Sequence, residues 1–272
     1  MKLHITSLLL PILPLAIMLL SSCEKELDFK YHDIDPLTVI EATLTPDGAK
    51  VGITLTTPMD EPMDRTRLTD ATVTLTDLTD GTSVTLLPDA DGFFADSAPG
   101  IFGHDYRLTV ERAGSRYEAE TTMYPPVEIE SLEFNWINMP YDQVAVLEGR
   151  FYDNPAVDGD CYWVKLYRNG EIYQWSEIDD RGAVDGLCTF FTLTSRRDTD
   201  EEDDDTVLFD GDVMTCTVMP ITRGMHDYLE ALQNDSNGPA MFTGSLCLGY
   251  FMATSPVSAS ITFHPDRIPE YR

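Results

Sequence analysis

The chain has 272 residues, and 47 acidic side chains against 18 lysines and arginines give it a formal net charge of −29 at pH 7. A polypeptide this acidic is repelled by phosphate backbones and by anionic bilayers, so nucleic-acid binding and adsorption to a negatively charged lipid surface are disfavoured. The hydrophobic content of 43% is that of a globular protein, and the length suffices for two domains.

Residues 1–22 have the pattern of an export signal. A basic start at Lys2 precedes the apolar stretch 8–20, which is too short to span a bilayer and is interrupted by prolines. The stretch leads into LSSC at 20–23, which resembles the lipobox of bacterial lipoproteins: an aliphatic residue, two small residues and the cysteine that receives the lipid. We therefore expect cleavage after residue 22 and lipidation of Cys23, with several acyl chains giving a stable anchor.

Residues 23–36 are expected to be a lipidated tether. The charged segment 24–28 (EKELD) resembles the tags that follow the lipidated cysteine in surface-displayed lipoproteins of the Bacteroidota. This resemblance implies anchoring in the outer membrane with exposure at the cell surface. A plain solvated tether, with the protein facing the periplasm, is the alternative.

Residues 37–124 alternate between apolar and polar side chains in short runs, which predicts antiparallel strands with one wet face. The clearest runs are 50–58, 71–78, 106–112 and 117–123. Hairpin connections are expected at Asp80-Gly81, Asp91-Gly92 and Ala113-Gly114, because glycine tolerates the positive φ that such turns need. About seven strands in roughly 90 residues predict an immunoglobulin-like or transthyretin-like β-sandwich.

Pro125-Pro126 separates this domain from residues 127–272, because a diproline favours an extended linker and donates no ladder hydrogen bonds. The strongest signal beyond it is a hairpin with Asn169-Gly170 at its turn. A regular ladder from that turn pairs Val164 with Trp175 and Leu166 with Tyr173. Its predicted core face carries Tyr162, Val164, Leu166, Tyr173 and Trp175.

The segment 221–238 (ITRGMHDYLEALQNDSNG) is the one convincing helix in the sequence. Met225, Tyr228, Leu229 and Leu232 would form a single apolar stripe, and Asn237-Gly238 would end the helix. The segment 246–263 is expected to provide one or two buried closing strands. The predicted fold is therefore mainly β: an N-terminal immunoglobulin-like or transthyretin-like sandwich, then a second β-rich domain with one helix.

No pattern of a known catalytic site occurs in the sequence. The histidines of the mature chain are scattered without metal-ligand spacing, and there is neither a G-x-S-x-G motif nor a phosphate-binding glycine loop. We therefore predict a protein without catalytic activity and without a cofactor.

Three aromatic residues, Trp136, Trp163 and Tyr167, are candidates for contact with a ligand, since exposed aromatic faces stack on sugars. In the predicted hairpin, Trp163 and Tyr167 lie opposite the core face. The alternative is that a second sheet or a helix covers this side as well.

The acidic run 196–205 (RRDTDEEDDD) could supply oxygen ligands for calcium. The candidate ligands are Asp198, Asp200, Asp203, Asp204 and Asp205. The run lacks the glycine turn and the terminal glutamate of an EF-hand, so a solvated, self-repelling loop is the favoured interpretation.

Four cysteines follow the predicted anchor: Cys161, Cys188, Cys216 and Cys247. In an exported protein an even number allows two disulfides, with three alternative connectivities. The other interpretation, held equally, is four small buried apolar side chains.

Several segments occur in an order that resembles one family. They are the region 92–123 of the first sandwich, VEIESLEF at 127–134, TVLFDGD at 206–212, GMHDYLEAL at 224–232 and GYFMATS at 249–255. With the lipobox, this order resembles the Bacteroidota lipoproteins catalogued as domain of unknown function DUF4249, over nearly the whole mature chain. That family has no established activity and no catalytic residues to transfer.

Genes of this family often lie beside outer-membrane TonB-dependent transporters. The resemblance therefore implies an accessory binding or assembly role at such a transporter. A free-standing surface lipoprotein that binds glycans or peptides, and a structural component of an adhesin or pilus, are the alternatives.

Overall fold

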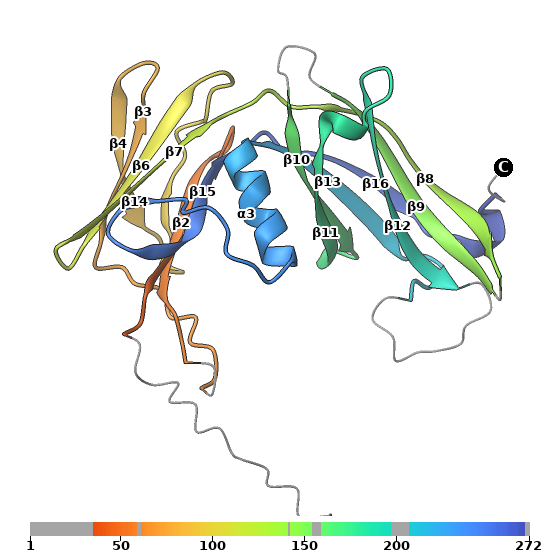
Figure 1. The fold of residues 1–272 in the computed structure, drawn as a ribbon, viewed down its shortest axis with the longest axis horizontal. Coiled ribbons are helices and arrows are strands. Elements are labelled where there is room, and N and C mark those ends of the chain that lie inside the picture. The colour runs from red at the N-terminus through yellow and green to blue at the C-terminus, as the bar shows by residue number, and fades with distance from the viewer. Residues whose placement is uncertain (1–34, 59–60, 141, 154–158, 197–206, 270–272) are drawn as a thin grey trace, which may run out of the picture. The chain divides into compact units, whose positions relative to one another are not determined.

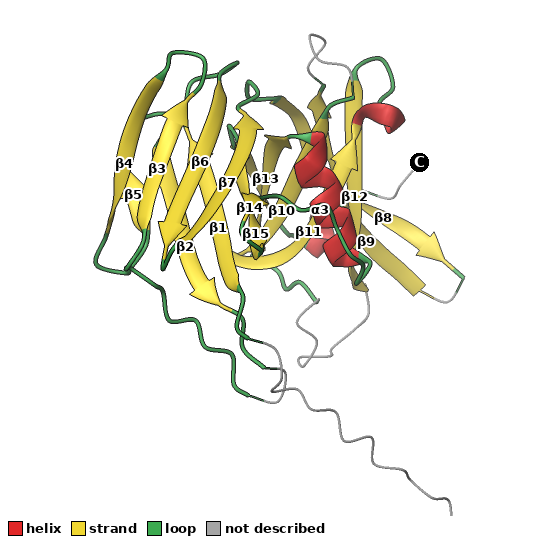
Figure 2. Ribbon diagram, turned by 60° about the vertical axis from the view of Figure 1, so that its left-hand side comes forward, coloured by secondary structure: helices red, strands yellow, loops and turns green. Residues whose placement is uncertain are grey.

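The computed structural model describes residues 35–58, 61–140, 142–153, 159–196 and 207–269, of which 36–57 and 63–269 belong to one compact unit. Nearly all of its regular structure is β (Figures 1 and 2). The first strands are β1 (Thr38–Thr45), β2 (Gly48–Leu55), β3 (Thr72–Asp77), β4 (Thr82–Pro88), β5 (Phe94–Asp96), β6 (Asp105–Arg112) and β7 (Ser115–Thr122). The mainly β fold predicted from the sequence is confirmed.

After Pro125-Pro126 the chain forms the strands of a second group. They are β8 (Glu128–Met139), β9 (Asp142–Tyr152), β10 (Cys161–Arg168), β11 (Glu171–Asp179), β12 (Leu187–Arg196) and β13 (Val213–Ile221). Helix α3 (Arg223–Gln233) follows, then β14 (Thr243–Gly244), β15 (Cys247–Ala253) and β16 (Val257–Thr262). The short 3₁₀ helices η1 (Asp180–Gly182) and η2 (Pro265–Arg267) complete the described elements.

The first sandwich is a nine-stranded sheet that curls over one core. Its strand order is β14-β7-β6-β3-β4-β5-β2-β1-β15, so the β4–β5 pairing joins its two halves. Ile40 and Ile53 from one half pack with Val73 and Leu108 from the other. Alternation of buried and exposed residues along β6 and β7 is the one-wet-face pattern expected from the sequence.

The glycine-containing turns are confirmed where the sequence predicts two-residue hairpins. Ala113 and Gly114, between β6 and β7, both have positive φ, at 50° and 84°. The Asn169-Gly170 turn between β10 and β11 repeats this arrangement, with φ of 51° and 92°. Two successive positive φ values match the right-handed twist of the strands that the turn joins.

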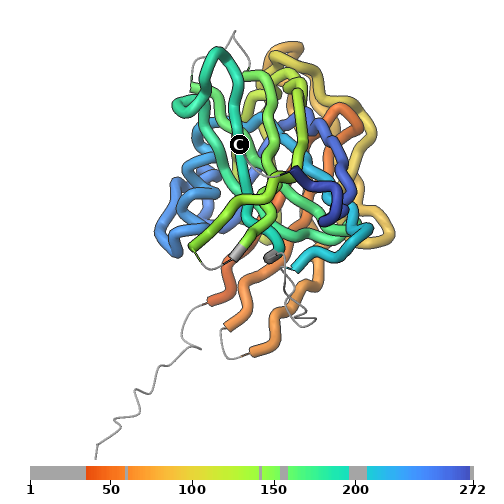
Figure 3. The backbone as a smooth tube through the Cα atoms, turned by 90° about the vertical axis from the view of Figure 1, so that its right-hand side faces the viewer, coloured from red at the N-terminus to blue at the C-terminus, as the bar shows by residue number. Residues whose placement is uncertain are grey.

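The second sandwich stacks the four-stranded sheet β11-β10-β13-β16 on the three-stranded sheet β12-β9-β8, and Figure 3 looks onto the side of the three-stranded sheet. Tyr162, Val164 and Leu166 of β10 point into the shared core, as predicted, and meet Leu147 and Phe151 of β9. Helix α3 lies on the other face of the four-stranded sheet, against β10 and β11.

The hairpin register is the first correction. Arg168 pairs with Glu171 as expected, but a bulge then places Leu166 opposite Gln174 and Lys165 opposite Trp175. The extra residue reverses the side to which the rest of β11 points. Trp175 therefore leaves the predicted core face and packs beside Trp163 on the α3 side.

The helix is shorter than its sequence pattern suggests. Thr222 caps its start by accepting the Met225 N–H (3.3 Å), and its C-cap is Asn234 rather than Asn237-Gly238. The chain beyond the helix folds back so closely that a Cβ on Gly238 would lie 3.0 Å from that of Ala231. Ala231 is therefore buried, whereas Leu232, expected in the apolar stripe, is half exposed on the open side.

Strands β14 and β15 are the largest correction. Both were expected in the second domain, residues 127–272, but β14 pairs with β7 and β15 runs parallel to β1, so both complete the first sandwich. Gly249 of β15 has φ 103°, and a Cβ there would lie 2.0 Å from the Ile40 carbonyl oxygen. This pairing satisfies the edge of β1 that β2 leaves unpaired and buries the apolar face of β15. The local periodicity of either strand does not show which edge will be unpaired.

Candidate functional site

The three aromatic residues considered as ligand contacts do not form one exposed platform. Trp136 of β8 is buried between the sheets, where its Nε1 donates to the Pro265 carbonyl oxygen (3.3 Å). Trp163 is buried on the opposite face of β10, and Tyr167 is half-buried. Both faces of β10 are covered, one by the three-stranded sheet and one by α3. This matches the alternative in which a second sheet or a helix covers the side of the hairpin opposite its core face.

Trp163 instead belongs to a packed cluster that links the two sandwiches. Its ring makes edge contacts with Trp175 (5.9 Å between centroids) and with Tyr250 of β15 (6.2 Å), and Lys165 Nζ lies 3.6 Å above it. Burial lowers the pKa of Lys165, against the pull of the Glu41 carboxylate, and raises that of Tyr250 to about 12. Edge-to-face contacts and a cation over an indole are each stabilising, so this cluster joins the sandwiches.

The four cysteines of the described chain are all unpaired. Cys161, Cys188 and Cys216 are buried, and burial raises the pKa of each thiol to about 12; Cys247 is half-buried and its pKa is raised to about 11. Thiols held in the neutral form are weak nucleophiles and weak metal ligands. Of the two interpretations of the sequence, these residues match the small buried apolar side chains.

One acid–histidine pair sits at the end of the first sandwich, where β3 ends and β6 begins. Asp77 Oδ2 lies 2.7 Å from His104 Nδ1, and Asp77 Oδ1 accepts the backbone N–H groups of Thr79 and Asp80 at 2.9 and 3.0 Å. Burial raises the pKa of Asp77, but these bonds outweigh it and leave that pKa below its usual value. The bond to Asp77 raises the pKa of His104.

A cavity of about 240 Å³ lies beside this pair, lined by Asp77, Asp80 and Tyr106 together with apolar side chains such as Ile101. Asp77, Asp80 and His104 each offer a ligand atom within 4.8 Å of the others. However, both oxygens of Asp77 already hold the β3–β4 turn and His104 in place. The pair is thus explained by its structural bonds, and we assign no metal to it.

A second such set lies on α3, where His226, Asp227 and Glu230 offer ligand atoms within 4.8 Å. His226 is buried and its Nδ1 lies 3.2 Å from Asp227 Oδ1, while both carboxylates face solvent. Residues at i, i+1 and i+4 of an acidic, exposed helix come together without any ligand, so this set is also left unassigned.

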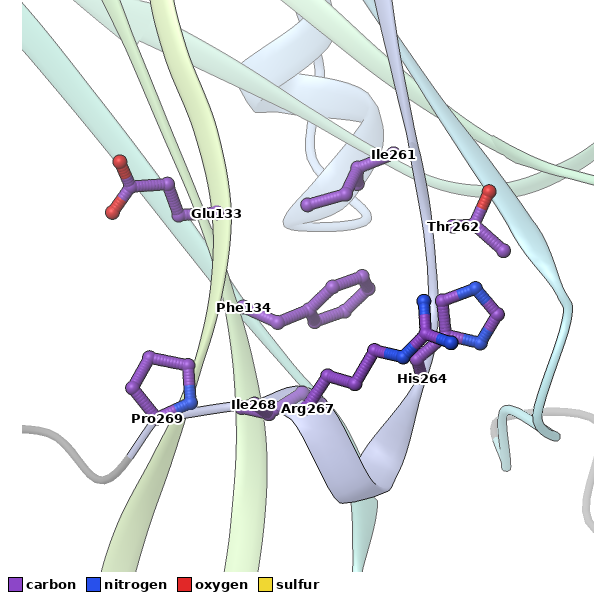
Figure 4. A pocket seen from close by; sticks show the side chains of 8 residues that line it. All are labelled: Glu133, Phe134, Ile261, Thr262, His264, Arg267, Ile268 and Pro269. Atoms are coloured by element: carbon purple, nitrogen blue, oxygen red, sulfur yellow. The ribbon is translucent and has the colours of Figure 1, made fainter.

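A pocket of about 290 Å³ opens at one side of the second sandwich, between β8, β16 and η2 (Figure 4). Phe134, Ile261 and Ile268 form its apolar floor, and Glu133 and Arg267 stand at its rim. The tail builds this pocket because the Trp136 backbone N–H donates to the Pro269 carbonyl oxygen (2.8 Å). The pocket could receive a small, partly apolar group. It was not predictable from the sequence, because its walls come from residues 133–134 and 261–269, which lie far apart along the chain.

Cys23 and the proposed calcium ligands Asp198, Asp200, Asp203, Asp204 and Asp205 lie outside the described residues. The signal peptide and most of the tether do so too. No helix in the described part of the chain is long and apolar enough to cross a membrane.

The family is decided by a match that covers most of the chain. The sequence model of a domain of unknown function, DUF4249, matches residues 24–259. The chain belongs to the DUF4249 family. No curated protein is found to be similar to it.

Among solved structures, a segment of two fibronectin type-III domains from chicken tenascin is similar to this DUF4249 protein at 11% sequence identity. That match covers 84% of this chain and 100% of the tenascin segment, with a TM-score of 0.23.

Proposed function

We propose that this DUF4249 protein is a lipid-anchored outer-membrane protein of a Bacteroidota cell, exposed at the surface, that serves a TonB-dependent transporter as a non-catalytic binding or assembly partner. One observation carries the proposal. The lipobox-like residues 20–23 end at Cys23, and the family region begins at the next residue, 24. A lipid on Cys23 would hold the two sandwiches at the membrane by a short acidic tether.

The chemistry of the described side chains supports a non-catalytic role. The buried thiols have pKa values raised to about 12, which suits packing and not nucleophilic attack. His104 and His264 each lie 2.7 Å from an aspartate, at the ends of the two sandwiches, and His226 faces Asp227. In the first of these pairs, Asp77 also accepts the backbone N–H groups of Thr79 and Asp80 and so holds the β3–β4 turn.

The test is purification of the tagged, lipidated protein from native membranes, with identification of the proteins that accompany it. A TonB-dependent transporter in equal amount, lost when Cys23→Ala removes the anchor, is the expected result. Incorporation of a labelled fatty acid into the wild type but not into Cys23→Ser checks the anchor separately. An unlabelled wild type, or a membrane fraction without any transporter, overturns the proposal.

A free-standing surface lipoprotein that binds peptides or glycans is the second candidate. The pocket beside Phe134, with its apolar floor and rim charges on Glu133 and Arg267, favours it. Peptide and glycan arrays probed with the wild type and with Arg267→Ala test it, and equal binding by the two proteins counts against that pocket.

A further inference from the structure

Strand β12 is an unusual edge. It is the last strand of the order β12-β9-β8, and its residues 187–195 (LCTFFTLTS) contain neither a charge nor a proline, in a chain of net charge −29. Edge strands are normally protected from pairing by charges, prolines or bulges. The one register shift of β12 lies near its end, between Leu193 and Arg196.

The outward face of β12 is also apolar. Phe191 is 73% exposed and Leu193 is 50% exposed, both on the side away from the sandwich core. Val184, 71% exposed, forms a bridge to Leu187 just before Phe191, and Tyr152 of β9 pairs with Leu187. These side chains extend along the strand for about 20 Å at 3.3 Å per residue.

The opposite side of the same sandwich shows what a covered edge looks like. There the chain's own tail, with Ile268 and Pro269, lies against β8 (Figure 4). The Trp136 backbone N–H donates to the Pro269 carbonyl oxygen, and the Trp136 indole donates to the Pro265 carbonyl oxygen. Val184 bonds to Leu187 at the start of β12, and beyond that bridge no described strand or tail pairs with the outer edge of β12.

We propose that β12 accepts an extended strand from a second protein, by addition to the three-stranded sheet. Its unpaired backbone groups would supply the hydrogen bonds, and Phe191 and Leu193 would contact apolar side chains at alternate positions of the incoming strand. The proposal deepens the proposed function, on which it rests for the identity of the partner, because it names the surface where that partner binds.

Charge decides which kind of strand fits. Glu148 of β9 is opposite Phe191 and forms an ion pair with Arg150 (2.6 Å), and Glu133 of β8, opposite Glu148, adds a second carboxylate. Exposed Asp185 stands just before β12. The incoming strand therefore carries lysine or arginine beside its apolar residues, and a second copy of this chain, itself at −29, is repelled.

The test uses the full lipidated protein in its native membrane, with the photo-crosslinker p-benzoylphenylalanine in place of Phe191. The matched control carries it in place of Leu87 of β4, which is 70% exposed on the first sandwich. We expect a covalent adduct at position 191 but not at 87, mapping by mass spectrometry to an extended, basic segment with alternating apolar residues. A synthetic peptide of that segment should bind the wild type at least ten-fold more tightly than it binds Phe191→Lys. It should bind Leu87→Lys as tightly as it binds the wild type.

Other outcomes overturn the proposal. They are no adduct at position 191, equal adducts at 191 and 87, an adduct to a second copy of the chain, or a helical or acidic target segment. A transporter that co-purifies without an adduct at 191 keeps the proposed function and rejects the strand. An adduct to a basic strand of a protein other than a transporter supports strand addition at β12 and rejects the proposed transporter partner.

Discussion

Gly249→Ala tests whether β15 closes the first sandwich as the structure has it. A residue other than glycine pays roughly 1–2 kcal/mol for left-handed backbone, and φ here is 103°. The new Cβ would lie 2.0 Å from the Ile40 carbonyl oxygen, where a Cβ practically never lies within 3.0 Å of another atom. Strands β1 and β15 must therefore separate at this point, which loses one or two ladder hydrogen bonds at about 1 kcal/mol each.

We therefore expect Gly249→Ala to lower the free energy of unfolding by about 2–4 kcal/mol, the sum of the backbone strain and the lost hydrogen bonds. Gly81→Ala is the matched control, because Gly81 has φ 72° but no atom within 4 Å of the new Cβ, so only the strain applies. Urea denaturation followed by tryptophan fluorescence measures both, and Trp163 reports directly because it contacts Tyr250 of β15. Equal losses for the two variants would refute the reasoning, because the parallel pairing would then contribute nothing.

Four further predictions follow from individual side chains. Trp136→Ala should cost about 3–5 kcal/mol of stability because its ring fills the second core, whereas Phe191→Ala should stay within about 0.5 kcal/mol; similar urea midpoints for the two would contradict their assigned positions. Thr222→Ala removes the N-cap of α3 and should cost about 1 kcal/mol, seen as a lower melting temperature by circular dichroism, while an unchanged value would mean that the cap is dispensable. The pKa of His104 is raised, so its bond to Asp77 stabilises the fold below the unfolded histidine pKa of 6.5, and this stabilisation is lost as the pH rises through the pKa of His104 in the folded protein. The pKa of Asp77 is lowered, so its stabilisation is present above the unfolded aspartate pKa of 3.8 and is lost as the pH falls through the pKa of Asp77 in the folded protein. The pair should therefore stabilise the fold fully between pH 3.8 and pH 6.5. By NMR, the His104 ring should titrate above 6.5, and Asp77→Asn should return the pKa of His104 to its ordinary value. The thiols of Cys161, Cys188 and Cys216 should react with a thiol reagent only on unfolding, and a reductant should leave the melting temperature unchanged; a reductant-dependent melting temperature would point to disulfides instead.

Properties that depend on neighbouring residues were predictable from the sequence. The positive φ of Asn169, Gly170 and Gly114 follows from residue type, because asparagine and glycine tolerate that region, while Ala113 adopts it because the two-residue turn between β6 and β7 requires it. The inward face of β10 follows from its two-residue alternation, and the position of α3 from its apolar spacing. The resemblance to DUF4249 rested on the order of such local segments, and membership of that family is confirmed by the match over 24–259.

The candidate surfaces were much less predictable, because exposure depends on what packs above a residue. Trp163 and Trp136 are of the residue type that forms aromatic ligand platforms, yet Trp163 is buried on the α3 side and Trp136 is buried between the two sheets. Phe191 has the composition of a core residue, yet it lies on an open edge. A bulge of one residue was enough to carry Trp175 from the predicted core face to the α3 side.

By itself, the sequence determined the β-rich class, the turns and the helix, since each of these depends on a few adjacent residues. Only the tertiary structure decided that β15 returns to pair with β1, some 200 residues away, and that β12 pairs with β9 on one side and has no neighbouring strand on the other in the described part of the chain. Strand pairing is settled by which edges and apolar faces remain unpaired when the rest of the chain has packed. Which edges and faces remain unpaired depends on the packing of the whole fold and is not encoded in any single segment.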